Sequence, residues 1–374
     1  MNRARWALLL LFAVACSNAP DTLPPPYTCE DVPLAAAQAW SKMALLGLAP
    51  TTTGCGVALA AFDTGWQSLS VGLTPCDAQP WPDGFTPASA RTLAPEGLLV
   101  TNKEATKVVK LTATGPTTWW SQPLASAATV ADADESPCGD RYVLLADTDA
   151  NHLLRLSAAG GVLWDQPGPF TGLAAACDGV YVAARAVSAV QPSHYMVSHD
   201  AWLARLTPDG HELWRQVRTP GGDWTIDSVT AIYGGVAAHF IALSMIGYSD
   251  ARDLESFHAD GTPGTRHDIR AWAQGGNFHY NDIALRPVAW PTGAWTWPIA
   301  YQASGPSWVK DDTRVEIVND DGTLLLSRSV SLQFATTAAV LGDGSLVIGG
   351  DTAWFYQPFG DAWAVRMPAC AAPE

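Results

Sequence analysis

The chain has 374 residues, of which 48% are hydrophobic and only 15% are charged, so its composition excludes a disordered protein and allows an extended core. Its formal net charge of −15 at pH 7 would repel the phosphate backbone of a nucleic acid. The 32 glycines and 27 prolines indicate many turns. We therefore expect a folded, turn-rich protein that does not bind nucleic acid.

The N-terminus predicts export. Residues 1–15 combine two arginines with an apolar run that is too short to span a bilayer, which is typical of a secretory signal peptide. The letters AVAC that end at Cys16 resemble the lipobox of bacterial lipoproteins. This resemblance implies lipidation of Cys16 and an outer-membrane lipoprotein of the bacterial cell envelope, facing either the periplasm or the surface. The alternative is an ordinary signal peptide with an incidental cysteine.

Behind the signal, the proline-rich residues 16–28 predict a flexible tether, and residues 29–374 are expected to form a single domain. Within this domain one hairpin pattern recurs, best seen in HLLRLSAAGGVLW (152–164) and DAWLARLTPDGHELW (200–214). Two alternating strands flank a small-residue turn, and a tryptophan follows. The turn glycines of five such hairpins are 46 to 61 residues apart, the spacing expected for four strands per unit.

A second pattern is a short apolar strand upstream of the hairpins, which begins near residues 56, 97, 141, 179, 235, 293 and 344. Uninterrupted apolar strands suit sheets that are buried on both faces. Together the two patterns resemble the β-propeller repeats of bacterial exported proteins, of the PQQ-like and related kinds, over roughly residues 30–370. The resemblance implies an all-β, seven-bladed β-propeller that the N-terminal segment closes.

The closing segment is PLAAAQAWSKMALLGL (33–48), because the last unit ends after DAWAVRM (361–367) and lacks a fourth strand. We expect residues 33–48 either to form that strand or to pack on the closure as a short amphipathic helix. With Cys16 set aside, six cysteines remain, which favours disulfides in an exported chain. The propeller resemblance implies the pairs Cys29–Cys370 at the seam, Cys55–Cys76 at a hairpin base and Cys138–Cys177 between neighbouring turns.

Motifs for catalysis are absent from the sequence, which contains no Gly-x-Ser-x-Gly, phosphate loop, His-Glu-x-x-His or Cys-x-x-Cys. The acidic stretches ADADES (131–136) and DTDANH (147–152) offer oxygen ligands for calcium, but they also suit ordinary solvated turns. We therefore expect no cofactor, with calcium as the alternative.

Long insertions occur in connections that a propeller places on one face, and they carry aromatic and polar residues. The candidate ligand-binding residues are His194, Tyr195, His199, Trp224, Asn277, His279, Tyr280, Trp308, Trp354 and Tyr356. Aromatic planes beside polar groups suit sugar rings or a partner protein. The alternative is that these rings pack the loops against each other. By contrast, Trp119, Trp164 and Trp214 recur at one strand position and are expected to pack between blades.

These features predict a non-enzymatic lipoprotein whose propeller binds a glycan or an envelope protein and touches the membrane only through its lipid. One alternative is a factor like the PQQ-repeat propeller of outer-membrane assembly. Another is a propeller enzyme, either a polysaccharide lyase or a quinone-dependent dehydrogenase. The oligomeric state stays open.

Overall fold

The computed structural model describes the strands and connections of a protein built from β-structure. The described residues are 36–51, 56–93, 96–121, 128–187, 199–218, 223–232, 234–243, 249–268, 279–280, 283–284, 288–289, 295–304, 313–318, 324–330, 335–351 and 361–367. All elements in these ranges are strands, from β1 to β30. The same ranges contain no helix with the length and apolarity that a membrane span requires.

Most strands belong to four-stranded antiparallel sheets of consecutive strands. The first sheet comprises β2 (Leu45–Pro50), β3 (Ala58–Phe62), β4 (Gly65–Leu69) and β5 (Pro75–Pro80). The second comprises β6 (Pro87–Thr92), β7 (Leu98–Asn102), β8 (Lys107–Thr112) and β9 (Gly115–Ser121). The third comprises β10 (Thr129–Glu135), β11 (Arg141–Ala146), β12 (Asn151–Leu156) and β13 (Val162–Gly168). The fourth comprises β14 (Phe170–Ala176), β15 (Gly179–Val187), β16 (His199–Leu206) and β17 (Glu212–Arg218).

The fifth sheet comprises β18 (Asp223–Ile232), β19 (Gly235–Leu243), β20 (Ser249–His258) and β21 (Pro263–Asp268). A six-stranded sheet follows, in which β22 (His279–Tyr280), β23 (Ile283–Ala284) and β24 (Val288–Ala289) all pair with β25 (Trp295–Ser304), and β26 (Thr313–Val318) and β27 (Leu324–Val330) complete it. The sixth four-stranded sheet, here the closing sheet, contains β28 (Ala335–Val340), β29 (Leu346–Asp351), β30 (Ala362–Met367) and β1 (Ala36–Trp40).

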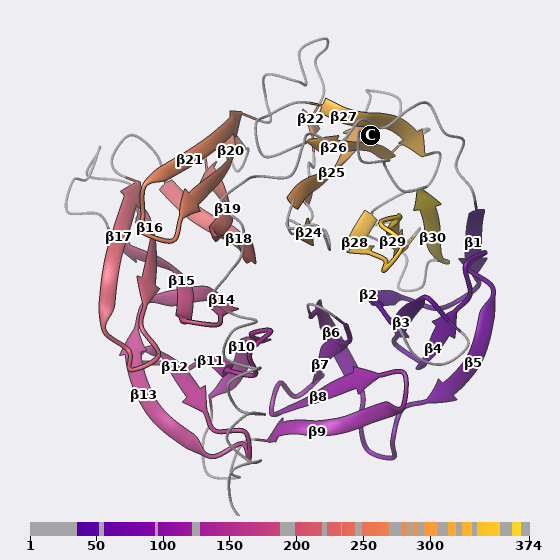
Figure 1. The fold of residues 1–374 in the computed structure, drawn as a ribbon, viewed down its shortest axis with the longest axis horizontal. Helices are drawn as coiled ribbons and strands as arrows, with labels where there is room; N and C mark the ends of the chain where they lie inside the picture. The colour runs from indigo at the N-terminus through magenta and orange to yellow at the C-terminus, as the bar shows by residue number, and fades with distance from the viewer. Residues whose placement is uncertain are drawn as a thin grey trace, which may run out of the picture.

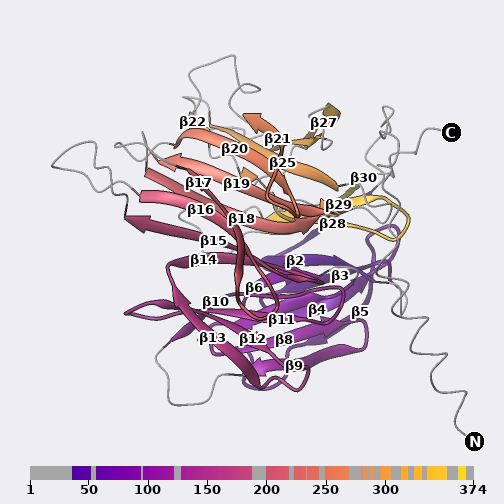
Figure 2. The same ribbon diagram turned by 60° about the vertical axis from the view of Figure 1, so that its left-hand side comes forward.

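The sheets stand in a ring around a central axis, with strands β2, β6, β10, β14, β18 and β28 nearest the middle (Figure 1). Neighbouring inner strands contact each other, as β2 does with β28 and β6, and β14 does with β10 and β18. Figure 2 shows the same sheets from the side, stacked as layers. All the predicted hairpins and apolar strands are present. In each hairpin two neighbouring strands pair with each other, as their alternating sequences predict.

The N-terminal segment closes the ring as a strand. β1 pairs antiparallel with β30 in a register that joins Ala36 to Arg366 and Trp40 to Ala362. Trp40 is buried, and its ring lies 5.1 Å from that of Phe62 in an edge-on contact. Over residues 36–40, the strand alternative is therefore confirmed over the helix. Residues 45–48 of that segment belong to β2, on the inner edge of the first sheet.

Apolar side chains fill the space between neighbouring sheets. In the cluster between the third and fourth sheets, for example, Tyr142 and Leu144 pack with Leu173 and Val182. Similar clusters join the closing sheet to the first, the first to the second, the second to the third and the fourth to the fifth. The core thus consists of separate apolar layers between sheets, and each layer stabilises the contact between two neighbouring sheets through burial of apolar surface.

Hydrogen bonds from side chains of one sheet to turn carbonyls of the next sheet recur in the ring and add to these apolar layers. The Trp164 indole donates to the Pro208 carbonyl of the next sheet at 2.7 Å, and Trp214 donates to the Ala259 carbonyl at 2.9 Å. The guanidinium of Arg155 joins the same Pro208 carbonyl to Asp140 of its own sheet. The predicted packing role of these tryptophans is therefore confirmed, and Trp119 is likewise buried between sheets.

The disulfide predicted between neighbouring sheets is present. Cys138 and Cys177 lie in the turns that follow β10 and β14, with their Cα atoms 5.1 Å apart. Cys76 is also disulfide-bonded, but Cys55, its predicted partner, lies outside the described residues. Cys16, Cys29 and Cys370 lie outside them as well, so lipidation and the pair Cys29–Cys370 stay predictions.

Candidate functional site

Most of the predicted ligand-binding residues lie outside the described part of the chain: His194, Tyr195, Asn277, Trp308, Trp354 and Tyr356. His279 and Tyr280 form β22 and pair with Ser304 and Ala303 of β25. His199 begins β16, and Trp224 is the second residue of β18. The structure therefore places His199 and Trp224 with their side chains.

His199 lies at a groove between the third and fourth sheets that has a volume of about 590 Å³. This surface, called the groove below, is lined by Asp147, Asp149, Ala150, Asn151, Pro167, Gly168, Pro169, Thr171, Arg185 and His199. Its walls come from the β11–β12 connection, from the β13–β14 connection and from the paired ends of β15 and β16. Two kinds of connection thus meet on one face, as the sequence predicts.

The wall formed by the fourth sheet carries Arg185 and His199, which form a charged triad with Asp223 of the fifth sheet. The Arg185 Nη2 atom lies 2.7 Å from both carboxylate oxygens of Asp223, the first residue of β18. The His199 Nδ1 atom lies 2.8 Å from Asp223 Oδ1 and 3.1 Å from Arg185 Nη2. All three side chains are between 26% and 30% exposed, so they are only partly shielded from water.

The triad fixes the proton on His199. An ionised carboxylate oxygen can only accept, so we assign a hydrogen to Nδ1, which then donates to Asp223, and the 3.1 Å approach of Arg185 Nη2 is a contact without a hydrogen bond. In the neutral imidazole this leaves Nε2 as an acceptor, and no described residue satisfies it. Burial opposes ionisation of Asp223, but the hydrogen bonds from Arg185 and His199 outweigh it and lower the pKa of Asp223 below its ordinary value.

Trp224 follows Asp223 but takes a different role. Its ring is partly buried against the apolar cluster between the fourth and fifth sheets. The Arg218 guanidinium carbon lies 5.9 Å from the centre of this ring and 5.3 Å from that of Phe240. For Trp224, the geometry favours the alternative that the aromatic rings pack the structure.

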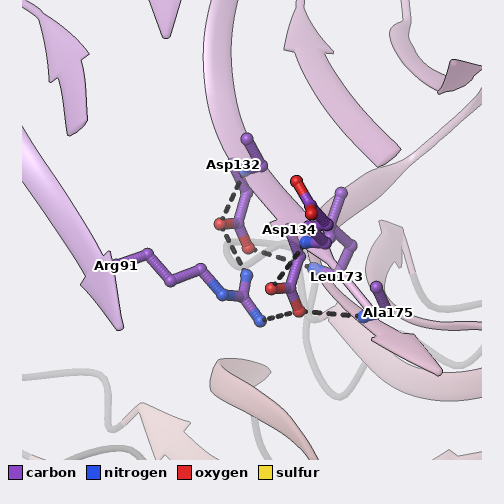
Figure 3. A network of polar contacts seen from close by, with 7 residues as sticks. Arg91, Asp132, Asp134, Leu173 and Ala175 are labelled. Atoms are coloured by element: carbon purple, nitrogen blue, oxygen red, sulfur yellow. Dashed lines mark hydrogen bonds and ion pairs between the residues drawn. The ribbon is translucent and has the colours of Figure 1, made fainter. Parts of the chain in front are cut away.

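Residues 131–135 of the first acidic stretch lie in strand β10, outside the groove, and only Ser136 takes part in the turn that follows. Asp132 and Asp134 lie on the inner strand β10, where each accepts from Arg91 of β6, at 2.8 and 2.7 Å (Figure 3). On the other side, the same carboxylates accept the backbone N–H groups of Leu173 and Ala175 in β14 (Figure 3). The expectation of a solvated turn here is wrong, because the stretch continues a strand whose carboxylates link three sheets.

Burial lowers the pKa of Arg91, but the two carboxylates outweigh this effect and raise it. Since these oxygens already bind a guanidinium, calcium at residues 131–136 would have to displace it. No group of three or more His, Cys, Asp or Glu side chains suited to a metal ion occurs within the described ranges. Calcium at residues 147–152 stays a prediction.

Sequence reasoning did not identify Arg185 and Asp223. A signal for Arg185 exists, because it is a lone charged residue near the end of an otherwise apolar strand. Asp223 gives no such signal, since its partners lie 24 and 38 residues away along the chain. Asp147 and Asp149 were recognised only as calcium ligands or turn residues.

Comparisons with known proteins identify the fold. No known family model and no curated protein matches the chain. A streptogramin B lyase structure shares 12% identity at a TM-score of 0.53, covering 88% of this chain and 97% of that one. The WD40 repeats of RRP9 share 10% identity at a TM-score of 0.54, covering 92% and 98%. A virginiamycin B lyase from Staphylococcus aureus shares 11% identity at a TM-score of 0.50, covering 88% and 99%.

Identities this low carry no function from these proteins to this one. The likeness to a lyase structure and to WD40 repeats nevertheless supports the ring of antiparallel sheets seen in Figure 1 as a β-propeller. The chain is therefore an all-β protein with the β-propeller fold.

Proposed function

We propose that this chain is a non-enzymatic binding protein of the bacterial cell envelope, a seven-bladed β-propeller held to the outer membrane by a lipid on Cys16. Its ligand is a glycan or an envelope protein, and the groove is part of the binding site. The count of seven blades takes the six-stranded sheet as one blade and the closing sheet as the last.

One observation supports this proposal above others: the groove lies where the β11–β12 connection, the β13–β14 connection and the paired ends of β15 and β16 meet. Its lining comes from two neighbouring sheets, and its volume of about 590 Å³ falls within the range of small-ligand sites. Ligand sites on rigid scaffolds are typically built from such connecting segments. The polar lining supplies hydrogen-bonding groups that the core does not use.

Filling the groove tests the proposal. Thr171 lines it and is exposed, so Thr171→Trp should occupy the space that a ligand needs. Thr117→Trp places the same ring at an exposed position of the outer strand β9 and serves as the control. Binding is measured on a glycan array and on a panel of purified envelope proteins. We expect at least a tenfold loss for Thr171→Trp alone, whereas equal binding by both variants would remove the groove from the site.

The membrane anchor needs a separate test. The wild type and Cys16→Ala are each produced in cells that are fed a labelled fatty acid. Only the wild type should become labelled. A labelled Cys16→Ala chain, or an unlabelled wild type, would contradict the lipoprotein assignment.

An enzyme is the second candidate, because a histidine paired with a carboxylate beside a groove can act as a general base. Turnover of a groove ligand that disappears in His199→Ala would establish this candidate. Binding without turnover keeps the non-enzymatic proposal.

A further inference from the structure

Several donor groups of the groove are already in use. Arg185 Nη2 donates to both oxygens of Asp223, and the Asn151 side-chain amide donates to the carbonyl of Phe170. Pro167 and Pro169 have no N–H to offer. The Arg185 Nε atom is buried and has no hydrogen-bond partner among the described residues. The side-chain donors left open to a ligand therefore include the Arg185 Nη1 group and the exposed Thr171 hydroxyl.

The acceptor groups, by contrast, are mostly open. In the neutral imidazole with hydrogen on Nδ1, His199 Nε2 is an acceptor, and no described residue donates to it. Asp147 uses Oδ1 to accept from the backbone and hydroxyl of Thr148, at 2.6 and 3.2 Å. Neither its Oδ2 atom nor the Asp149 carboxylate receives a hydrogen bond from any described residue. The groove thus presents an excess of acceptors.

Charge leads to the same conclusion. The positive charge of Arg185 is balanced by Asp223, so this ion pair adds no net charge. Asp147 and Asp149 then leave the lining with two unbalanced negative charges. In a concave surface such charges concentrate the field and attract cations.

The groove also has an apolar part, formed by the rings of Pro167 and Pro169. Lysine and arginine side chains combine an aliphatic stem with a cationic head that carries several N–H donors. The proline rings can contact the aliphatic stem of such a side chain. The open carboxylates and the oriented imidazole can accept hydrogen bonds from its cationic head.

We propose that the groove binds a basic peptide segment, taking a lysine or arginine head group on His199 Nε2 and the carboxylates of Asp147 and Asp149. This inference rests on the proposed binding function and narrows its ligand from a glycan or protein to a cationic peptide. Asp223 acts as a positioning residue, because it holds the His199 ring in the tautomer that accepts.

The test measures binding of a labelled oligolysine peptide by fluorescence anisotropy at physiological salt, where charges farther apart than about 8 Å are largely screened. Asp147→Asn with Asp149→Asn removes the two groove charges while keeping side-chain size. The control, Asp83→Asn with Asp209→Asn, removes the same charge from two exposed turns outside the groove. Both pairs lie at exposed sites, so both proteins should fold.

We expect the groove pair to lower the affinity at least tenfold and the control pair to change it less than twofold. The same peptide with acetylated lysines should fail to bind. Equal losses in the groove and control pairs would reduce the interaction to overall charge and overturn the proposal. Equal binding of the acetylated peptide, no binding of oligolysine to the wild type, or a preference for amino-sugar oligomers would overturn it as well.

The two proposals fail in distinguishable ways. If Thr171→Trp abolishes binding of a ligand that the Asp147→Asn, Asp149→Asn protein still binds fully, only the cationic-peptide inference falls. If Thr171→Trp leaves every ligand bound, the groove itself is excluded and both proposals fall.

Discussion

Arg91 shows how single residues connect the inner strands of this ring. Its side chain is only 10% exposed, and both carboxylates that bind it are 12% exposed. A guanidinium between two carboxylates is tolerated at such a depth because each charge has a close partner and further hydrogen bonds. Removing one partner from this set leaves the other charges without compensation.

We therefore predict that Arg91→Met lowers the free energy of unfolding by about 3–5 kcal/mol, since Asp132 and Asp134 lose the Arg91 guanidinium while staying nearly buried. Urea titration followed by tryptophan fluorescence measures the change. Adding Asp132→Asn and Asp134→Asn to Arg91→Met should recover part of the loss. A loss below about 1 kcal/mol for Arg91→Met would show that water compensates the carboxylates.

Tyr142 and Tyr181 illustrate the cost of buried hydroxyl groups. Desolvation raises the pKa of each phenol to about 12, and nearby aspartates add to the effect. In the unfolded chain a tyrosine ionises near pH 10, so between about pH 10 and 12 the native state holds protons that the unfolded state has lost. Stability is thus complete below pH 10 and falls as the pH rises toward 12.

The variant Tyr142→Phe should show a shallower decline of stability between pH 10 and 12, because one of these protons is removed. At pH 8 its unfolding free energy should equal or exceed that of the wild type by up to about 1 kcal/mol, since the buried Tyr142 hydroxyl has no hydrogen-bond partner among the described residues. Urea unfolding at pH 8, 10 and 11 measures both effects. A destabilised Tyr142→Phe at pH 8 would reveal a partner for the hydroxyl.

Asp223 provides a residue-scale test that does not need the ligand. If Asp223 accepts from Nδ1 of His199, then Asp223→Asn, whose amide can donate, should shift the imidazole toward the other tautomer. The ¹⁵N chemical shifts of His199 distinguish the two tautomers. His152, which contacts Asp165 on the outside of the third sheet, is the internal control and should not change. An unchanged His199 would remove Asp223 from its positioning role.

At the scale of strands, local sequence was sufficient wherever pairing is local. The β16–β17 hairpin could be predicted because alternating residues surround Pro208, Asp209 and Gly210, and its register follows from that turn. The same holds for β12 and β13. The sequence of each hairpin specifies its own strand pairing, so the fold class could be predicted from these hairpins.

Elements with distant partners could not be resolved in this way. The alanine-rich residues 36–40 suit a helix or a strand, and the free edge of β30 at the other end of the chain decides between them. Residues 131–136 resemble a turn, but Arg91 and β14 stabilise them as a strand. The Arg185–Asp223 pair of the candidate site likewise joins two sheets and leaves no pattern in either segment.

The indole hydrogen bonds that join β13 and β17 to the next sheet give the prediction at the scale of strands. Trp214→Phe and Trp164→Phe each remove an indole N–H that donates to a carbonyl across the interface, and each should cost about 1–2 kcal/mol beyond the smaller ring. Trp40→Phe is the matched control, because its buried N–H has no partner among the described residues. Thermal unfolding compares the three variants. Equal losses in all of them would assign the effect to ring volume alone.

The whole molecule depends on the pairing of β1 with β30. A protein that begins at residue 43 lacks β1 and exposes the backbone edge of β30, whereas one that begins at residue 30 keeps the pairing. We expect the shorter protein to unfold at lower temperature and to self-associate, since free edges pair with other chains. Calorimetry and size-exclusion chromatography provide the measurements. Identical behaviour of the two proteins would show that the ring is stable without β1.

This pairing has a consequence for how the protein is made. The backbone N–H of Lys42 and the carboxylate of Asp361, which meet beside the β1–β30 contact, are 319 positions apart. Strand β1 emerges from a ribosome or a translocation channel long before β30, so the ring stays open until β30 has been made. Pairing between strands so far apart in the chain is slow. A chain that terminates early lacks β30 and leaves strand edges unpaired at the gap in the ring, which makes it a substrate for proteases.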